Sequence, residues 1–217
     1  MKIALLGASR GLGFDVAKLA LKKNELFIAA RKVELLDSLP LEEDEVIELL
    51  ACDFSKPENL IELIDKLKQF QPERIWYFAG GGPYGEFASK NWQDHMWAWQ
   101  VTFLSPAHLI FEFLKNEFKN CQQFIVVGSE VAEDKPDPKA ASYCSAKHAL
   151  KGLLTSLQLE APSVDLRLFS PGYMDTDLLP PNAYPRQQNL LILSPDRVAE
   201  DFWRWAFNPQ AERHFYY

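Results

Sequence analysis

Short apolar runs alternate with longer amphipathic segments along the whole chain. An apolar run bounded by charged or turn-forming residues is typical of a buried strand. Such runs predict strands at residues 3–6, 26–30, 46–51, 75–78, 124–127 and 164–169, and residues 214–217 are a candidate for a last short strand.

The segments between these strands carry apolar residues at helical spacing. In residues 57–70, for example, one face is expected to carry Leu60, Ile61, Ile64 and Leu67. Pro57 suits the first turn of that helix, where the missing N–H of proline has no helical partner. Helices are therefore expected at 11–22, 57–70, 91–118, 142–160 and 195–207. The alternation predicts an α/β fold, with a parallel sheet covered by helices on both faces.

Length and charge restrict the class of protein. A chain of 217 residues suits one well-packed domain, so residues 1–217 are expected to fold as a single unit. The formal net charge of -7, without any basic run, argues against nucleic acid or an anionic membrane surface as a partner. No apolar run approaches the roughly 18 residues that a membrane span needs. The first predicted strand leaves no room for a cleavable leader, so a cytoplasmic location is expected.

Cysteine and histidine give no sign of a metal or disulfide site. Cys52, Cys121 and Cys144 are widely spaced and form no C-x-x-C pair, and the four histidines are scattered. Free thiols in a reducing compartment are therefore expected, with no bound metal.

A glycine-rich turn follows the first predicted strand and opens the first predicted helix. Glycines permit a tight turn and the close approach of a pyrophosphate, while the helix N-terminus offers free N–H groups. We interpret the turn, spaced G-x-x-x-G-x-G, as phosphate-binding; the alternative is that its glycines only end a strand. The candidate contacts are Gly7, Ser9, Arg10, Gly11, Leu12 and Gly13.

The end of the second predicted strand bears on the choice of cofactor. NAD-binding domains place an acid there for the ribose hydroxyls, but this chain continues with Arg31 and Lys32. Arg10 and Arg31 could bind a 2′-phosphate, which favours NADP(H) over NAD(H). The alternative is that Arg31 and Lys32 are ordinary surface cations. Asp53 could contact adenine or cap the following helix, and the adjacent Phe54 is a further candidate contact.

A possible proton-transfer pair lies in mid-chain. Tyr143 and Lys147 are one helical turn apart, and a neighbouring ammonium, helped by an oxidised nicotinamide, is expected to lower the pKa of the tyrosine. Tyr143 could then exchange a proton with a carbonyl or alcohol, while Ser129, at the end of a strand, holds the same oxygen. Y-x-x-x-K alone can be a plain surface contact. The order of glycine turn, strand-end serine and Y-x-x-x-K is far more specific.

With these motifs the sequence resembles the short-chain dehydrogenase/reductase family over essentially its whole length. The similar segments, besides the glycine turn, are Phe78-Ala79-Gly80, Val127-Gly128-Ser129, Tyr143-Cys144-Ser145-Ala146-Lys147 and Ser170-Pro171-Gly172-Tyr173-Met174-Asp175-Thr176. The resemblance implies a single-domain Rossmann-like, doubly wound fold and an NAD(P)-dependent oxidoreductase such as a carbonyl reductase. It implies Tyr143 as acid/base, Ser129 as the group that orients the substrate and Lys147 as the ribose-binding residue. It also implies cofactor contacts at Ala79, Gly80, Pro171, Gly172 and Thr176.

Two positions depart from the family's pattern. Tyr77 and Phe78 stand where the family often has Asn-Asn before Ala-Gly, and Thr102 stands at a helix asparagine that supports a water of the proton relay. Pro106 lacks the N–H that would bond the Thr102 carbonyl in a continuous helix. We hypothesise that this carbonyl keeps the relay water, which makes Thr102 a candidate catalytic residue. The alternative is that Pro106 only kinks the helix.

Aromatic residues crowd the predicted helix at 91–118 beyond what one core-facing stripe needs. A homodimer through the 91–118 and 142–160 helices is therefore expected, unless these side chains pack against the chain's own sheet. Residues 173–194 are expected to form a short substrate lid and residues 81–85 another wall of the pocket. Neither loop carries a charged cluster that would select a substrate.

The sequence thus predicts an NADP(H)-dependent oxidoreductase acting on a small carbonyl or alcohol. One alternative is a non-catalytic NADP(H)-binding sensor or scaffold with the same fold. A second is an epimerase or dehydratase built on the same site, which would regenerate its cofactor.

Overall fold

The protein is built on one parallel β-sheet. The computed structural model describes residues 1–42, 45–133 and 135–217, and its seven strands follow the order β3-β2-β1-β4-β5-β6-β7. All neighbouring strands pair in parallel. Their bounds are Lys2–Leu6 (β1), Glu25–Ala30 (β2), Ile47–Ala51 (β3), Arg74–Tyr77 (β4), Gln123–Val127 (β5), Asp165–Ser170 (β6) and His214–Tyr216 (β7). The direction of winding reverses between β1 and β4, and open α/β sheets bind their ligands at such a switch point.

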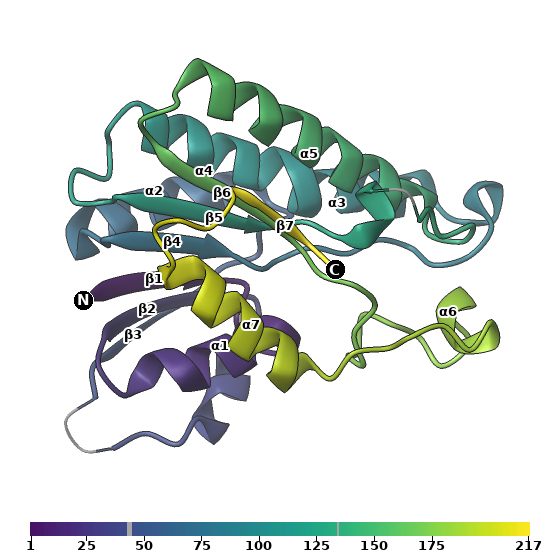
Figure 1. The fold of residues 1–217 in the computed structure, drawn as a ribbon, viewed down its shortest axis with the longest axis horizontal. Helices are drawn as coiled ribbons and strands as arrows, with labels where there is room; N and C mark the ends of the chain where they lie inside the picture. The colour runs from purple at the N-terminus through teal and green to yellow at the C-terminus, as the bar shows by residue number, and fades with distance from the viewer. Residues whose placement is uncertain (43–44, 134) are drawn as a thin grey trace.

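Helices cover both faces of the sheet, which confirms the predicted doubly wound α/β fold (Figure 1). On one face lie α1 (Gly11–Leu21) and α7 (Pro195–Phe207), and on the other lie α2 (Pro57–Phe70), α4 (Ser105–Leu114) and α5 (Ala141–Glu160). Two apolar cores result. Ile3 and Leu5 of β1 pack into the first core, and Ala4 and Leu6 into the second. Burial on both faces explains why the central strands read as unbroken apolar runs.

The helix predicted at 91–118 is divided into three segments. It consists of α3 (Trp92–Trp99), a π-helical segment Gln100–Leu104 and α4, which ends at Leu114. The Ser105 N–H bonds to the carbonyl of Gln100, five residues back, and Pro106 has no N–H to restore the regular ladder. The backbone is thus helical without a gap from Trp92 to Leu114, but it widens to a π-helix just before the proline and ends before the predicted residue 118.

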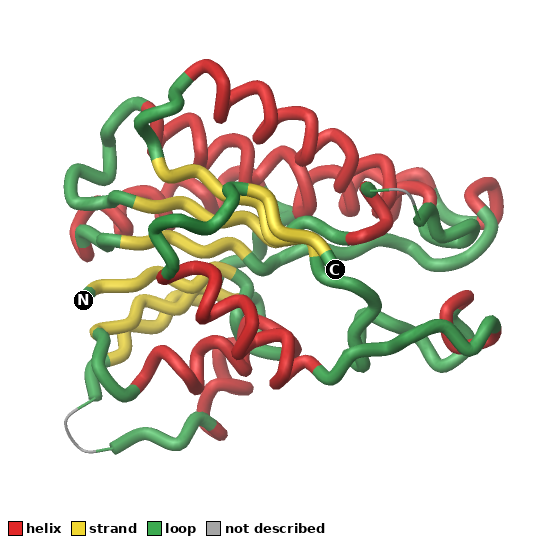
Figure 2. Tube along the Cα trace, in the orientation of Figure 1, coloured by secondary structure: helices red, strands yellow, loops and turns green. Residues whose placement is uncertain are grey.

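The segment between β6 and α7 contains only one short helix, α6 (Tyr184–Gln187). It extends away from the sheet beside the carboxyl ends of the strands (Figure 2). Three 3-10 turns complete the described elements, at Val33–Ser38, Phe87–Ser89 and Glu130–Ala132. Within the described ranges, every helix is too short or too polar to cross a lipid bilayer.

Candidate functional site

A cavity of about 500 Å³ opens at the carboxyl ends of the strands. Nearly all candidate residues from the sequence line it, although they come from the whole length of the chain. These are Gly7, Ser9, Arg10, Gly11, Leu12, Gly13, Arg31, Asp53, Phe54, Ala79, Gly80, Ser129, Tyr143, Lys147, Pro171, Gly172 and Thr176. Thr102 is the exception, because it is fully buried behind the cavity wall.

The glycine turn forms one end of the cavity. Gly7 has a φ of +88°, and a Cβ placed on it would lie 2.5 Å from the backbone nitrogen of Ala79. A Cβ on Gly13 would lie 2.8 Å from the Cα of Ala8, so both positions require glycine. The α1 helix begins after Arg10 without a side-chain cap. Its first N–H groups therefore suit a phosphate, and the turn fits a nicotinamide dinucleotide.

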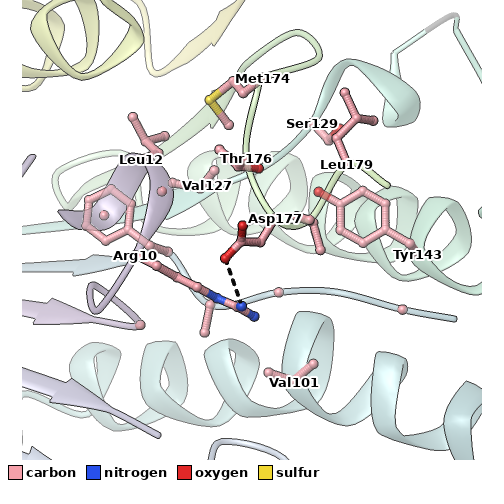
Figure 3. Close-up of a pocket in the computed structure, with 18 of the residues that line it drawn as sticks. Arg10, Leu12, Val101, Val127, Ser129, Tyr143, Met174, Thr176, Asp177 and Leu179 are labelled. Atoms are coloured by element: carbon pink, nitrogen blue, oxygen red, sulfur yellow. Dashed lines mark hydrogen bonds and ion pairs between the residues drawn. The ribbon is translucent and has the colours of Figure 1, made fainter. Parts of the chain in front are cut away.

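Two arginines stand at this end of the cavity. Arg31 is exposed, and Arg10 reaches across to Asp177 of the segment after β6, with 3.5 Å between Nη1 and Oδ2 (Figure 3). Asp53 accepts hydrogen bonds from the amide and hydroxyl of Ser55 at 3.0 and 2.7 Å. Burial alone would raise the pKa of Asp53, but these bonds and the nearby Arg31 hold it below its usual value. The charged form of the Asp53 carboxylate is thus favoured mainly by Ser55 and, to a smaller extent, by the charge of Arg31.

The three candidate reacting groups meet at the other end of the cavity. Ser129 lies two residues after the end of β5, immediately before the 3-10 turn Glu130–Ala132. Tyr143 and Lys147 lie in the first two turns of α5. Ser129 and Tyr143 lie beside each other (Figure 3). The Lys147 Nζ lies 5.4 Å from the centre of the Tyr143 ring and donates a hydrogen bond of 2.6 Å to the carbonyl of Val127. This arrangement places a phenol, a hydroxyl and an amine around one small volume.

Burial reverses the pKa change that the sequence suggested for Tyr143. Its pKa is raised to about 12 because burial disfavours the phenolate, and the hydrogen bond with Ser129 offsets this only in part. Burial also lowers the pKa of Lys147 to about 7. Near neutral pH this amine is therefore only partly protonated, so it offers less positive charge to Tyr143 than the sequence led us to expect. A separate positive charge in the cavity would be needed to do so.

The loop after β4 is fastened to the π-helical segment by contacts that the sequence did not predict. The hydroxyl of Thr102 donates to the carbonyl of Gly81 and accepts from its N–H, both at 3.1 Å. The hydroxyl of Tyr77 donates to the carbonyl of Val101 at 2.6 Å. Tyr77 and Thr102, which make these bonds, are two of the positions where the family pattern has asparagine. The departure from Asn-Asn was the available signal, but it did not reveal the compensating partners.

Aromatic and aliphatic side chains form the wall around Tyr143. The residues of this wall are Pro83, Tyr84, Trp97, Val131, Tyr173, Leu178 and Leu179, together with the carboxylate of Asp137. The hydroxyl of Tyr84 accepts the N–H of Tyr184, which ties the loop after β4 to α6. The predicted wall at 81–85 and the predicted lid both contribute to this end. Trp97 and Asp137 were not predicted, since neither belongs to a recognisable motif.

The described residues hold no group of three or more His, Cys, Asp or Glu side chains arranged for a metal ion. In the same part of the chain, Cys52, Cys121 and Cys144 are free thiols. The chemistry of the cavity therefore has to be read from its hydroxyl, amine and carboxylate groups.

Comparison with known proteins connects this geometry to a family. The family model for short chain dehydrogenases matches residues 2–185. A Dehydrogenase/reductase SDR family protein 7-like from Dictyostelium discoideum is 22% identical over 192 residues, which are 81% of this chain and 59% of the relative. The chain thus spans less than two thirds of the length of this curated relative.

Solved structures share the fold over the full chain. An alcohol dehydrogenase from the archaeon Thermococcus sibiricus, complexed with 5-hydroxy-NADP, superposes with a TM-score of 0.83 at 24% identity, covering 100% of this chain and 95% of the other. A 4-hydroxyisoleucine dehydrogenase complexed with NADH gives 0.84 at 18% identity, covering 99% and 96%. A dehydrogenase from Sphingobium yanoikuyae in complex with NADPH gives 0.82 at 18% identity, covering 99% and 87%.

Proposed function

Because the chain belongs to the short-chain dehydrogenase family, we propose that it is an NADP(H)-dependent oxidoreductase acting on a carbonyl or alcohol substrate. The observation that carries the proposal is the meeting of Ser129, Tyr143 and Lys147 at one end of a cavity whose other end is the glycine turn. When bound, the nicotinamide supplies or accepts the hydride. The protein then has to bind the substrate oxygen and move one proton.

Tyr143 is the proposed acid/base. With its pKa raised to about 12, the phenol is protonated at neutral pH, which is the form that donates to a carbonyl oxygen. The Ser129 hydroxyl, next to it, holds the same oxygen. In the reverse direction the phenolate takes the proton of an alcohol, and this direction needs a higher pH or a positive charge close by. The site therefore favours carbonyl reduction near neutral pH.

Lys147 is proposed to bind the ribose of the nicotinamide. Its Nζ is already oriented by the bond to Val127, and a Cβ on Gly80 would lie 3.3 Å from it, so little free space surrounds the amine. A bound cofactor with its hydroxyls in this place would supply further acceptors. Such acceptors favour the ammonium form and would raise the pKa of Lys147 above about 7.

Thr102 is proposed to act through its backbone carbonyl in a proton relay. In a regular helix this carbonyl would bond to the N–H four residues later, and that residue is Pro106. The preceding carbonyl, of Val101, accepts from the hydroxyl of Tyr77, which is outside this helix. This neighbouring contact supports the proposal that the Thr102 carbonyl binds the relay water.

The preference for NADP(H) rests on Arg10 and Arg31. Both line the cavity beside the glycine turn, and β2 ends at Ala30 without a carboxylate for the ribose hydroxyls. The solved relatives were obtained with NADP-type cofactors and with NADH, so the choice has to be measured on this protein. Titration with NADPH and NADH at one ionic strength should give tighter NADPH binding. Arg31→Ala should weaken NADPH binding and leave NADH binding nearly unchanged; preferential NADH binding would overturn the assignment.

A homodimer through α3, α4 and α5 is proposed from their outer faces. Trp92, Met96, Phe111 and Leu159 are exposed on these helices, with Leu159 at 81%, and Leu104 of the π-helical segment between α3 and α4 is exposed as well. An added Cβ on Gly152 of α5 would meet no atom within 4 Å. Because glycine has no side chain, another helix could approach the backbone of α5 closely at this position. Apolar side chains on a continuous face are a feature of subunit interfaces.

Substitution of Tyr143 by phenylalanine tests the proposed chemistry. The variant keeps the ring in the wall of the cavity and removes only the proton donor. We expect turnover of carbonyl substrates to fall by about 100-fold or more while NADPH binding persists. Unchanged turnover would contradict the acid/base role of Tyr143. If the wild-type protein binds NADPH and reduces no carbonyl, the alternative of a non-catalytic NADP(H)-binding sensor would take its place.

A further inference from the structure

A buried carboxylate lies at the substrate end of the cavity. Asp137 is 5% exposed, yet it lines the same cavity as Ser129 and Tyr143. Its Oδ1 accepts the Lys139 amide at 2.9 Å and the Tyr84 hydroxyl at 3.2 Å, while Oδ2 lies 3.4 Å from the same Tyr84 oxygen. Tyr84 has one hydroxyl proton, so these contacts provide two donors. An ionised carboxylate can accept about four.

Asp137 has no cationic partner among the residues that the structure describes. The neighbouring buried acid, Glu130, is different: one of its oxygens pairs with Lys135 at 2.9 Å, and the other accepts the Tyr173 amide at 2.8 Å. A buried charge without an opposite charge is costly, and such groups are typical of binding sites. Asp137 therefore has capacity for a charged donor that enters the cavity.

The surroundings of Asp137 suit an organic cation. Tyr84, Tyr143 and Tyr173 pack together around a small apolar cluster next to it. The pKa of Tyr173 is raised by burial and by the charges of Asp137 and Glu130, so its ring stays neutral. Neutral aromatic faces beside a carboxylate attract an ammonium group through its charge and its N–H donors. The same negative charge repels a substrate carboxylate.

Resting on the proposed function, we propose that Asp137 selects substrates that carry an ammonium group close to the reacting oxygen, that is, amino alcohols and amino ketones. The ammonium donates to the free capacity of the Asp137 carboxylate while Ser129 and Tyr143 hold the oxygen. Oxidation of such an alcohol breaks the carbinol C–H bond and passes the hydride to NADP+. The hydroxyl proton leaves through Tyr143, so an amino ketone, NADPH and a proton are formed and the amine is unchanged.

Three alcohols of similar shape distinguish an effect of substrate charge from an effect of substrate shape. They are 2-amino-1-phenylethanol, 1-phenyl-1-propanol and 3-hydroxy-3-phenylpropanoate. They place an ammonium, a methyl or a carboxylate group at corresponding positions near the carbinol. With NADP+ at pH 8 we expect kcat/KM to fall in that order. In Asp137→Asn, which keeps the acceptor for the Lys139 amide, kcat/KM for the amine should fall roughly 10- to 100-fold. The value for the methyl compound should change little, and that for the carboxylate should rise.

Glu130→Gln is the matched control, since it makes the same change of carboxylate to amide in a neighbouring buried acid outside the cavity lining. It should leave the ratio of amine to methyl kcat/KM unchanged. An equal loss for all three alcohols in Asp137→Asn would show that Asp137 only positions the loop, and would overturn the proposal. So would a wild-type preference for the methyl or carboxylate compound.

A binding measurement keeps the inference separate from the proposed function. If the wild-type protein oxidises none of the three alcohols, binding of 2-phenylethylamine to the NADP+-saturated protein can be followed by saturation-transfer NMR. Binding that is lost in Asp137→Asn would uphold the cation site while counting against the proposed reaction. Equal binding to both proteins, or binding to neither, would overturn the cation site.

Discussion

Replacing Lys147 with methionine should change how the stability of the protein depends on pH. The lysine is 3% exposed, and burial lowers its pKa from 10.5 to about 7 in the folded protein. Methionine has a similar length and no charge, so it fills the same space without a titrating group. The loss of the bond to the Val127 carbonyl adds an offset that does not vary with pH.

The sign follows from the lowered pKa. Below pH 7 the lysine is protonated in both the folded and the unfolded chain, and the folded state carries the full cost of a buried ammonium. Between pH 7 and 10.5 the unfolded chain keeps the proton and the folded chain releases it, so stability rises with pH. From pH 6 to pH 9 the wild-type protein should gain about 2–3 kcal/mol relative to Lys147→Met.

Urea unfolding of the cofactor-free proteins at pH 6, 7, 8 and 9 measures this difference. The other titrating groups contribute nearly equally to both proteins and cancel in the comparison; the raised pKa of Tyr143, about 12, acts above this range. The two curves of unfolding free energy should diverge steadily above pH 7. Parallel curves would refute the reasoning, since they would show that the buried amine stays protonated in the folded state.

Four further substitutions test local features of the structure. Gly7→Ala should destabilise the protein by about 1 kcal/mol or more and abolish NADPH binding, because its φ is +88° and the Cβ has no room. Gly152→Ala, with open space around the Cβ, should instead be neutral or stabilising by up to about 1 kcal/mol, and urea titration checks both. Pro106→Ala supplies an N–H to the Thr102 carbonyl, so it should lower kcat without changing the Kd for NADPH; an unchanged kcat would refute the relay. Phe111→Glu, at a half-exposed position, should convert a dimer into monomers on light scattering while the unfolding free energy changes by less than about 1 kcal/mol; an unchanged mass would place the interface elsewhere.

Local sequence patterns determined the elements and the ends of the cavity. Apolar runs marked the central strands because residues buried on both faces must be apolar at every position. The glycine turn was readable because the backbone itself needs glycine there, as the space around Gly7 shows. Ser129, Tyr143 and Lys147 were found because their spacing in the chain matches a strand end and one helical turn.

Tertiary structure decided what these groups can do. The hydroxyl of Tyr77 donates a hydrogen bond to the Val101 carbonyl of the π-helical segment, a contact between residues that lie 24 positions apart in the chain. The pKa of Tyr143 rises because its burial outweighs the hydrogen bond with Ser129, and burial is a property of the folded chain rather than of local spacing. Asp137 has no motif at all. The fold buries its carboxylate beside the hydroxyl of Tyr84, with no cationic partner among the residues that the structure describes, and no local spacing encodes this arrangement.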